Sequence, residues 1–331
     1  MPRSTSTCLV SLLTLTAIIG GCSDATPSAE TGSAKRVIAV IPKGTNHEFW
    51  KSIHAGAVKA SQDLDVEIIW KGPAREDDRD DQIKVVEQFI TRGVDGIVIA
   101  PMDDTALVRP LKEAMADGIP VVVIDSGVNW DGYISFVATD NVHGGELAAD
   151  ALAEQLGGRG KVVMLRYVEG SASTSKREEG FIDRMRSKYP DIEILSDNQH
   201  GGATLEGCLS ASENLLDRFA EIDGIFAPCE PVTVAFLRTL GQSGRKESTV
   251  LVGFDASEVL VAGLRSGGID ALVVQSPFAM GEEGVALLVK TLNGEEVPKR
   301  LDTGCVVITA ANMDDPANKD LLDPPLAKYL D

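Results

Sequence analysis

The 331-residue sequence is poor in positive charge. It has 31 lysines and arginines against 50 aspartates and glutamates, a formal net charge of −19 at pH 7. This balance leaves no basic face for nucleic acid or anionic lipid, and it favours solubility outside the cytoplasm. We therefore expect neither a nucleic-acid partner nor a membrane-surface role for the folded part of the chain.

Cysteine is also scarce, and its spacing excludes a metal site of the usual kind. Cys8 and Cys22 lie in the N-terminal segment, which leaves Cys208, Cys229 and Cys305, an odd number without metal-ligand spacing. Either two of these three pair in an oxidising compartment or all are buried thiols, and the spacing favours thiols. We expect no metal and no cofactor.

Two catalytic motifs are absent. The sequence has no Gly-x-Ser-x-Gly, and "HEFWK" is not a zinc-binding His-Glu-x-x-His because Lys51 occupies the second ligand position. We therefore do not expect an enzyme. One catalytic alternative stays open, a glycosidase that would use Asp125 and Asp255 as a carboxylate pair.

The only long apolar run lies at the N-terminus. Eleven residues from Leu9 to Ile19 follow Arg3, too few to cross a bilayer but typical of a secretory signal. The Ile-Gly-Gly-Cys sequence that ends at Cys22 resembles a bacterial lipobox, in which the cysteine is lipidated. The alternative is ordinary cleavage with this cysteine incidental. Residues 23–35 are typical of a flexible tether. We expect a periplasmic or cell-surface protein that touches the membrane only through its anchor.

The remaining chain of about 300 residues alternates apolar runs with amphipathic stretches, which predicts doubly wound α/β sheets and two lobes. Most apolar runs are rich in Val and Ile throughout, as in parallel strands buried on both faces. The predicted strands are 36–42, 66–70, 95–101, 119–125, 134–138, 161–167, 192–196, 223–228, 249–255, 269–275 and 305–310.

An internal repeat supports two similar lobes. "GVDGIVIAP" and "EIDGIFAP" place Asp95 and Asp223 128 positions apart, and "PVVVIDSG" and "TVLVGFDAS" place Asp125 and Asp255 130 apart. The later aspartate of each half follows a strand. Ligands of open α/β sheets bind at the carboxyl ends of strands, so two facing lobes would bring Asp125 and Asp255 into one cleft.

Seven stretches resemble periplasmic sugar-binding proteins of the ribose/galactose type, the solute receptors of ABC importers with the type I periplasmic binding fold. They occur in family order from residue 36 to about 310. They are "VIPKGTNHEFWKSIHAGA", "VDGIVIAPMD", "IPVVVIDSG", "FVATDNVHGGELAAD", "SKREEGF", "VGFDAS" and "VVQSPFAMGEEGV". The resemblance implies a small-molecule sugar ligand, an ABC transporter permease as partner, and a monomer.

The resemblance also implies a three-segment hinge. The crossings would lie near Thr139–Asp140, Gln275–Ser276 and Gly304–Cys305. The N-terminal lobe would then comprise 36–139 plus 276–304. The C-terminal lobe would comprise 140–275 plus 305–331, with the C-terminal tail packed outside.

Apolar contacts to the ligand are expected from Phe49 and Trp50, which match the family's paired aromatics on either side of a sugar ring. The alternative is that both belong to the core. Asn46 and His47 match the polar positions just before them, although His47 could instead be a surface residue.

Polar contacts are expected from four further residues. Asp125 and Asp255 would accept sugar hydroxyls, unless they only cap loops. Arg177 matches an arginine that binds ring and hydroxyl oxygens, unless it pairs with a neighbouring glutamate. Gln275 matches a hinge residue that both donates and accepts.

The sequence departs from the ribose-type pattern at two places. Ser126 stands where ribose receptors carry an arginine, and Cys229-Glu230 replaces an Asn-Asp pair, which puts ribose itself in doubt. Ser126, Thr139, Cys229 and Glu230 are further candidate contacts. We do not expect a transcription factor of this fold, because it would need an N-terminal helix-turn-helix where this sequence has a predicted signal peptide. A receptor that reports to a membrane kinase or chemoreceptor remains open.

Overall fold

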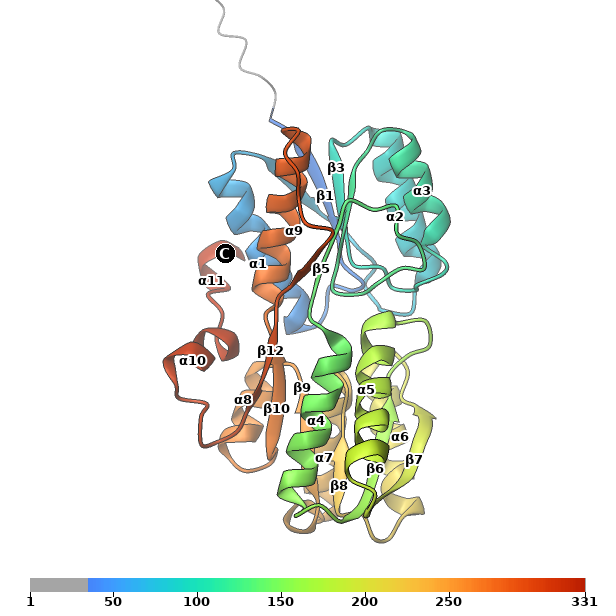
Figure 1. Ribbon diagram of the computed structural model, residues 1–331, viewed down its shortest axis with the longest axis vertical. Helices are drawn as coiled ribbons and strands as arrows, with labels where there is room; N and C mark the ends of the chain where they lie inside the picture. The colour runs from blue at the N-terminus through green and yellow to red at the C-terminus, as the bar shows by residue number, and fades with distance from the viewer. Residues whose placement is uncertain (1–34, 331) are drawn as a thin grey trace, which may run out of the picture. The chain divides into compact units, whose positions relative to one another are not determined.

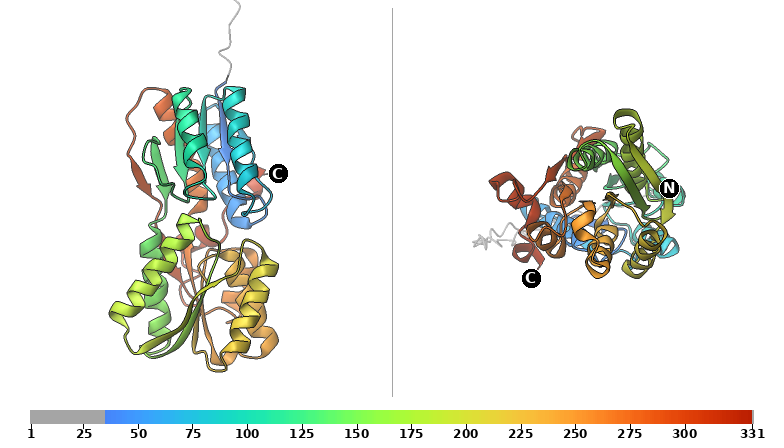
Figure 2. Two further views of the ribbon diagram at one scale, coloured as in Figure 1. Left: turned by 90° about the vertical axis from the view of Figure 1, so that its right-hand side faces the viewer. Right: turned by 90° about the horizontal axis from the view of Figure 1, so that it is seen from below.

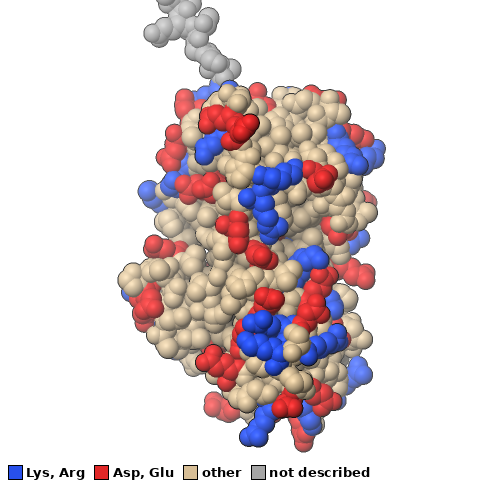
Figure 3. Space-filling view, in the orientation of Figure 1, with Lys and Arg blue, Asp and Glu red and all other residues tan. Residues whose placement is uncertain are grey.

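The computed structural model describes residues 35–330. The predicted signal segment, the lipidation site Cys22 and the predicted tether up to residue 34 lie outside the described residues. No helix within residues 35–330 combines the length and the apolar character that a membrane span requires. On the face drawn in Figure 3, lysines and arginines are interspersed with aspartates and glutamates.

Two six-stranded sheets form the framework, with strand orders β11-β5-β4-β3-β1-β2 and β12-β10-β9-β8-β6-β7 (Figure 1). The first contains β1 (Val37–Ile41), β2 (Glu67–Trp70), β3 (Gly96–Ile99), β4 (Val121–Ile124), β5 (Ser135–Ala138) and β11 (Arg300–Asp302). The second contains β6 (Gly160–Arg166), β7 (Ile192–His200), β8 (Gly224–Phe226), β9 (Val250–Phe254), β10 (Ala271–Gln275) and β12 (Cys305–Ile308). Within the sheets all neighbours are parallel except β10 and β12.

Helices cover both faces of each sheet, seen from two further sides in Figure 2. In the first lobe α1 (Glu48–Asp63) and α9 (Pro277–Leu292) cover one face, and α2 (Arg79–Arg92) and α3 (Val108–Ala116) cover the other. In the second lobe α4 (Asn141–Gln155) and α5 (Ala172–Lys188) lie opposite α6 (Leu205–Arg218), α7 (Glu230–Ser243) and α8 (Glu258–Arg265). A 3₁₀ turn spans Lys246–Ser248, and α10 (Pro316–Leu322) and α11 (Ala327–Leu330) complete the chain.

The burial of β1 explains why the strands lack polar alternation. Ile38 and Val40 enter the core under α1 and α9, whereas Ala39 and Ile41 enter the core under α2. Because both faces are buried, every residue of such a strand is apolar. This confirms the predicted α/β class with two parallel-sheet lobes. All eleven predicted strand runs contain a strand, and β11 was missed because it is short and largely exposed.

The internal repeat corresponds to equivalent positions in the two lobes. Asp95 Oδ2 accepts a hydrogen bond from the amide of Val37 (2.7 Å), and Asp223 Oδ2 accepts one from the amide of Lys161 (2.7 Å). Each aspartate therefore holds the start of the first strand of its lobe, β1 or β6, which lies next to an edge strand. The two sheets also share one strand order, β1 to β5 matching β6 to β10.

The chain passes between the sheets after β5, after β10 and after β11. The segment after β12 also reaches both lobes. Met313 packs in the core of the second lobe, whereas the ring of Tyr329 lies 5.7 Å from that of Phe278 on α9, and α11 contacts α1 (Figure 1).

Paired glycines let two helix pairs approach closely. A Cβ at Gly281 would lie 2.0 Å from the carbonyl oxygen of Ile53, and one at Gly56 would lie 1.9 Å from that of Phe278. The α4–α5 pair of the second lobe repeats this arrangement. No side chain larger than hydrogen fits at these contacts.

We expect Gly281→Ala to lower the free energy of unfolding by about 3 kcal/mol or more, because the methyl group meets backbone that cannot move aside. Gly241→Ala on α7 is the matched control. A Cβ there meets nothing within 4 Å, so helix propensity should stabilise the protein by about 0.5–1 kcal/mol. Urea denaturation measures both variants, and equal stability of the two would contradict the close contact.

Candidate functional site

The carboxyl ends of the two sheets each present one aspartate. Asp125 follows β4 and Asp255 follows β9, with φ of 58° and 73°, in the left-handed region that non-glycine residues seldom adopt. Their amides donate to equivalent carbonyls, those of Val137 (3.0 Å) and Val273 (2.9 Å). Such strained backbone persists where surrounding structure holds it, often at functional sites.

Both aspartates line one narrow cleft between the lobes. The other lining residues are Lys43, His47, Phe49, Trp50, Glu76, Tyr167, Ser171, Ser173, Thr174, Arg177, Cys229, Glu230, Pro231 and Gln275. The free volume of about 30 Å³ would hold only two or three water molecules. The structure is thus a closed arrangement of the lobes.

Hydrogen-bond acceptors without partners surround Asp255. Its carboxylate accepts from Gln275 Nε2 (2.6 Å) and from the amide of Glu230 (2.9 Å). Gln275 Oε1 and Glu230 Oε2 are buried and have no partner among the described residues. A buried acceptor without a donor is unfavourable by roughly 1–3 kcal/mol, so these oxygens are suited to hydroxyl donors from a ligand.

Two aromatic rings at the start of α1 line the same cleft. The rings of Phe49 and Trp50 stand nearly perpendicular (87°), with centroids 5.0 Å apart. Both also belong to the core under α1, so the core and cleft interpretations hold together. Glu76 Oε1 accepts from Trp50 Nε1 (2.7 Å) and from His47 Nδ1 (2.8 Å), which fixes the indole and the imidazole.

Arg177 is buried and held on three sides. Its Nε donates to Asn141 Oδ1 (2.7 Å), its Nη1 donates to the carbonyl of Pro228 (3.0 Å), and its guanidinium lies 4.0 Å from the centre of the Phe254 ring. The neighbouring Glu178 binds Arg166 instead (2.8 Å). Arg177 is therefore positioned at the cleft rather than engaged in a surface ion pair.

Three sequence-predicted residues do not line the closed cleft. Asn46 is exposed in the loop before α1. Ser126 is fully buried, and its hydroxyl accepts from the amide of Ser173 (3.1 Å). Thr139 is also buried and donates to the carbonyl of Gly304 (3.2 Å), next to the crossings.

Sequence reasoning missed Lys43 as a cleft residue. Its ammonium is 2.9 Å from Asp125 Oδ2 and donates to the hydroxyls of Ser171 (3.2 Å) and Ser173 (3.0 Å) in the other lobe. Lys43 follows β1, so the strand-end position that identified the aspartates could also have identified it. Glu76 lies in the loop between β2 and α2, and Thr174 lies in the first turn of α5. Neither directly follows a predicted strand, so the strand-end argument does not identify them.

Cys208, Cys229 and Cys305 are free thiols in the described part of the chain. Cys229 lines the cleft, and burial raises the pKa of its thiol well above the usual value. Its side chain is therefore neutral at physiological pH and serves as a small apolar wall.

Burial and charge shift the acid–base behaviour of the cleft. Burial raises the pKa of Glu230 to about 7 and also raises the pKa of Asp255. Burial alone would lower the pKa of His47, but its hydrogen bond to Glu76 together with the nearby carboxylates outweighs burial, so the pKa of His47 is raised. At Glu76 burial would raise the pKa, but the bonds to His47 and Trp50 and the charges of His47 and Lys43 together hold the pKa below the usual value.

These shifts predict a pH-dependent stability. The folded protein keeps a proton on Glu230 up to about pH 7, whereas the unfolded chain loses it near 4.5. The contribution of Glu230 is therefore complete below about pH 4.5 and is lost as pH rises through 7. His47 acts in the same direction, since its pKa is also raised.

We expect Glu230→Gln to remove a large part of the fall in melting temperature between pH 5 and 8, because the amide does not ionise. Glu247→Gln, at an exposed position, should retain the wild-type profile. Differential scanning fluorimetry across this range makes the comparison. A Glu230→Gln profile parallel to the wild type would rule out Glu230 as a source of the pH dependence.

Residues 38–296 match a family model described as a periplasmic binding protein domain. The ribose import binding protein of Bacillus subtilis is 29% identical over 277 residues, covering 84% of this chain and 88% of its own length. That of Escherichia coli is 28% identical over 268 residues, covering 80% and 87%.

Two solved structures are similar throughout the described fold. A carbohydrate transporter solute binding protein from Agrobacterium radiobacter, in complex with D-arabinose, has a TM-score of 0.85 and 31% identity over 88% of this chain and 100% of its own. An ABC transporter solute binding protein from Agrobacterium vitis with bound D-fucose has a TM-score of 0.82 and 37% identity, covering 87% and 100%.

Proposed function

Because the chain belongs to the periplasmic binding protein family, whose relatives here are sugar-binding proteins of ABC transporters, we propose that it captures a sugar or similar small polyhydroxy molecule between its lobes. The observation that carries this proposal is the meeting of Asp125 and Asp255, one from each sheet, in one closed cleft. Two carboxylates on opposite walls can grip hydroxyls at both edges of one ring.

Each class of cleft residue has a role in this proposal. The carboxylates and Gln275 accept from ligand hydroxyls, Arg177 donates to ring or hydroxyl oxygens, and Phe49 and Trp50 pack on apolar C–H faces. Micromolar binding corresponds to about 8 kcal/mol. Divided over roughly a dozen heavy atoms this is about 0.7 kcal/mol per atom, within the range of small ligands.

The ligand need not be ribose. Ser126 is used within the protein rather than at the cleft, and Cys229 brings an apolar thiol to the cleft where ribose receptors carry an amide, with the carboxyl of Glu230 beside it. A site built to pair a hydroxyl discriminates against analogues that lack it, so these changes alter specificity. A pentose, hexose or polyol fits this chemistry.

We further propose that the protein is a non-enzymatic, monomeric receptor, lipid-anchored through Cys22, that delivers its ligand to an ABC permease. The family is extracytoplasmic, which supports the predicted export. Closure of the lobes about three crossings would report occupancy to the permease. A membrane kinase or chemoreceptor could respond to the same closure, and deletion of the neighbouring permease or kinase gene would distinguish the two by loss of uptake or of response.

A thermal-shift screen of the mature chain against pentoses, hexoses and polyols tests the proposal. A ligand at 100 times its dissociation constant stabilises the folded state by about 2.7 kcal/mol, a shift of several degrees. We expect at least one sugar to produce such a shift and to be recovered unchanged after incubation. If no member of the panel shifts the melting temperature, sugar capture is contradicted, and turnover of glycosides would instead favour a glycosidase.

A further inference from the structure

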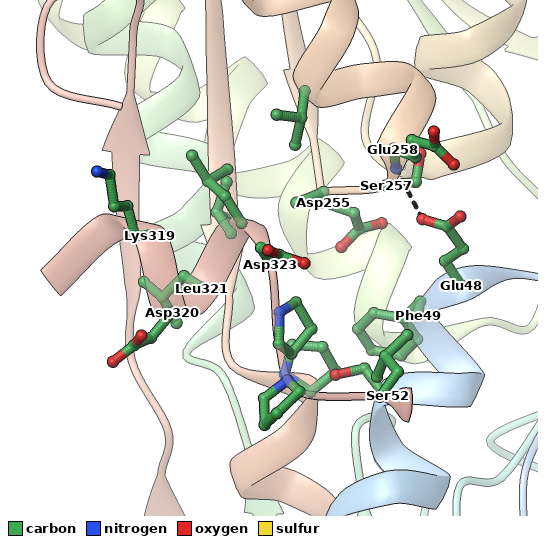
Figure 4. Close-up of a pocket in the computed structure, with 18 of the residues that line it drawn as sticks. Glu48, Phe49, Ser52, Asp255, Ser257, Glu258, Lys319, Asp320, Leu321 and Asp323 are labelled. Atoms are coloured by element: carbon green, nitrogen blue, oxygen red, sulfur yellow. Dashed lines mark hydrogen bonds between the residues drawn. The ribbon is translucent and has the colours of Figure 1, made fainter. Parts of the chain in front are cut away.

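A second pocket, which we call the hinge-side pocket, adjoins the cleft (Figure 4). Its volume is about 1100 Å³, and it lies among the first turns of α1 and α8, the β10–α9 junction and the C-terminal segment 313–328. Phe49, Asp255 and Gln275 line both this pocket and the cleft. A group attached to a ligand held by Asp255 would therefore lie next to the hinge-side pocket.

Three side chains that line the hinge-side pocket carry buried oxygens without hydrogen-bond partners among the described residues. They are Ser52 Oγ, Ser257 Oγ and Gln275 Oε1, and each residue is at most 5% exposed. Ser52 comes from the first lobe and the other two from the second (Figure 4). Two hydroxyls and an amide oxygen at one pocket are unfavourable unless a polar ligand or solvent pairs with them.

The other walls of the hinge-side pocket are largely apolar. Phe49 contributes a ring, Val261 and Val274 contribute branched side chains, and the C-terminal segment adds Leu321 and Leu322. Glu48 closes one edge, where its Oε2 accepts from the amide of Glu258 (2.8 Å) across the lobes. Apolar faces edged by hydrogen-bonding groups suit a second sugar ring. The charged residues of the lining have both signs, with Arg265, Lys319 and Lys328 as well as carboxylates such as Glu48 and Asp255.

We propose that the protein's ligand is a disaccharide, with one ring in the cleft and the second in the hinge-side pocket. This inference rests on the proposed function and names its substrate class. The hinge-side pocket, at about 1100 Å³, exceeds what one sugar ring needs, and it shares Phe49, Asp255 and Gln275 with the cleft. Ser52 and Ser257 would then determine which linkage is accepted, because they meet the second ring from opposite lobes.

Isothermal titration calorimetry with disaccharides and their constituent monosaccharides tests this inference on the full mature chain. At least one disaccharide should bind at least tenfold more tightly than either constituent. Ala262→Trp, at an exposed position of α8 that lines the hinge-side pocket, should remove that gain and leave monosaccharide binding unchanged. Ser52→Ala should reduce it about fivefold, the effect of one hydrogen bond.

Val259→Trp is the matched control, since Val259 is 46% exposed on the same helix and does not line the pocket. It should bind every sugar as the wild type does. Monosaccharide binding with no tighter disaccharide, or disaccharide binding untouched by Ala262→Trp, would overturn the disaccharide inference and leave the proposed function standing. Binding of neither class would overturn the proposed function as well.

Discussion

Asp255→Asn is expected to weaken sugar binding by two to four orders of magnitude while the free protein stays folded. Two charge-assisted hydrogen bonds from ligand hydroxyls contribute about 1.5–3 kcal/mol each, which sets this range. The loss of stability should be only about 1–3 kcal/mol, because asparagine keeps one of the two accepting oxygens and burial already disfavours the ionised carboxylate, as its raised pKa indicates. Calorimetric titration with a sugar from the screen, and thermal melting without it, measure the two effects.

Asparagine is the appropriate substitution because it tolerates the left-handed backbone of Asp255 (φ 73°) better than alanine does. Asp95→Asn provides the control. Asp95 occupies a repeat position but holds the β1 amide of Val37, away from the cleft. Its substitution should lower stability and leave affinity unchanged. Near-wild-type affinity of Asp255→Asn would refute the assignment of this carboxylate to the ligand site.

Lys43→Met is expected to shift the free protein from the closed towards the open arrangement of its lobes by two to three orders of magnitude. The side chains of Lys43 and Asp125 are each about 4% exposed. Without the ammonium, closure would bury the Asp125 carboxylate without a partner, which destabilises the closed arrangement by about 3–5 kcal/mol. The hydrogen bonds to Ser171 and Ser173 of the other lobe would also be lost. Small-angle scattering should report a larger radius of gyration.

The double variant Lys43→Met/Asp125→Asn should close again in part, because it removes the unpaired charge as well. Lys51→Met, on the exposed face of α1, should scatter as the wild type does. A closed Lys43→Met protein would mean that neither the charge of Lys43 nor its contacts with the other lobe control closure. An open double variant would instead assign closure to the serine contacts.

The fold could be predicted from the sequence because its signals are local. Continuous Val/Ile runs indicate strands buried on both faces, and Gly93, in the left-handed conformation that glycine favours, ends α2. The repeated Asp-Gly pairs reported equivalent lobes because Asp95 and Asp223 make the same contact. β11 was missed because edge pairing, rather than burial, defines it.

The candidate site was predictable only where a residue's position follows from topology. Asp125 and Asp255 end strands, so parallel-sheet geometry brings them together. Lys43 also follows a strand, but a lysine in a polar loop is ordinarily solvated, and only the opposite lobe buries it. Glu76 reaches the cleft from a loop, and its bonds to His47 and Trp50 depend on tertiary packing. The hydrophobic periodicity of the sequence does not indicate such contacts.

The bonds around Arg177 connect ligand recognition to bending of the molecule. Asn141 accepts from Arg177 and donates to the carbonyl of Thr139 (3.2 Å), whose own hydroxyl donates to Gly304. These last two residues belong to separate connections between the sheets. A rotation that twists those connections would therefore move the guanidinium, and a sugar bound to Arg177, as proposed, would resist the twist. Ligand binding at Arg177 and the angle of the hinge would then be coupled, so ligands that orient Arg177 differently would set different degrees of lobe closure.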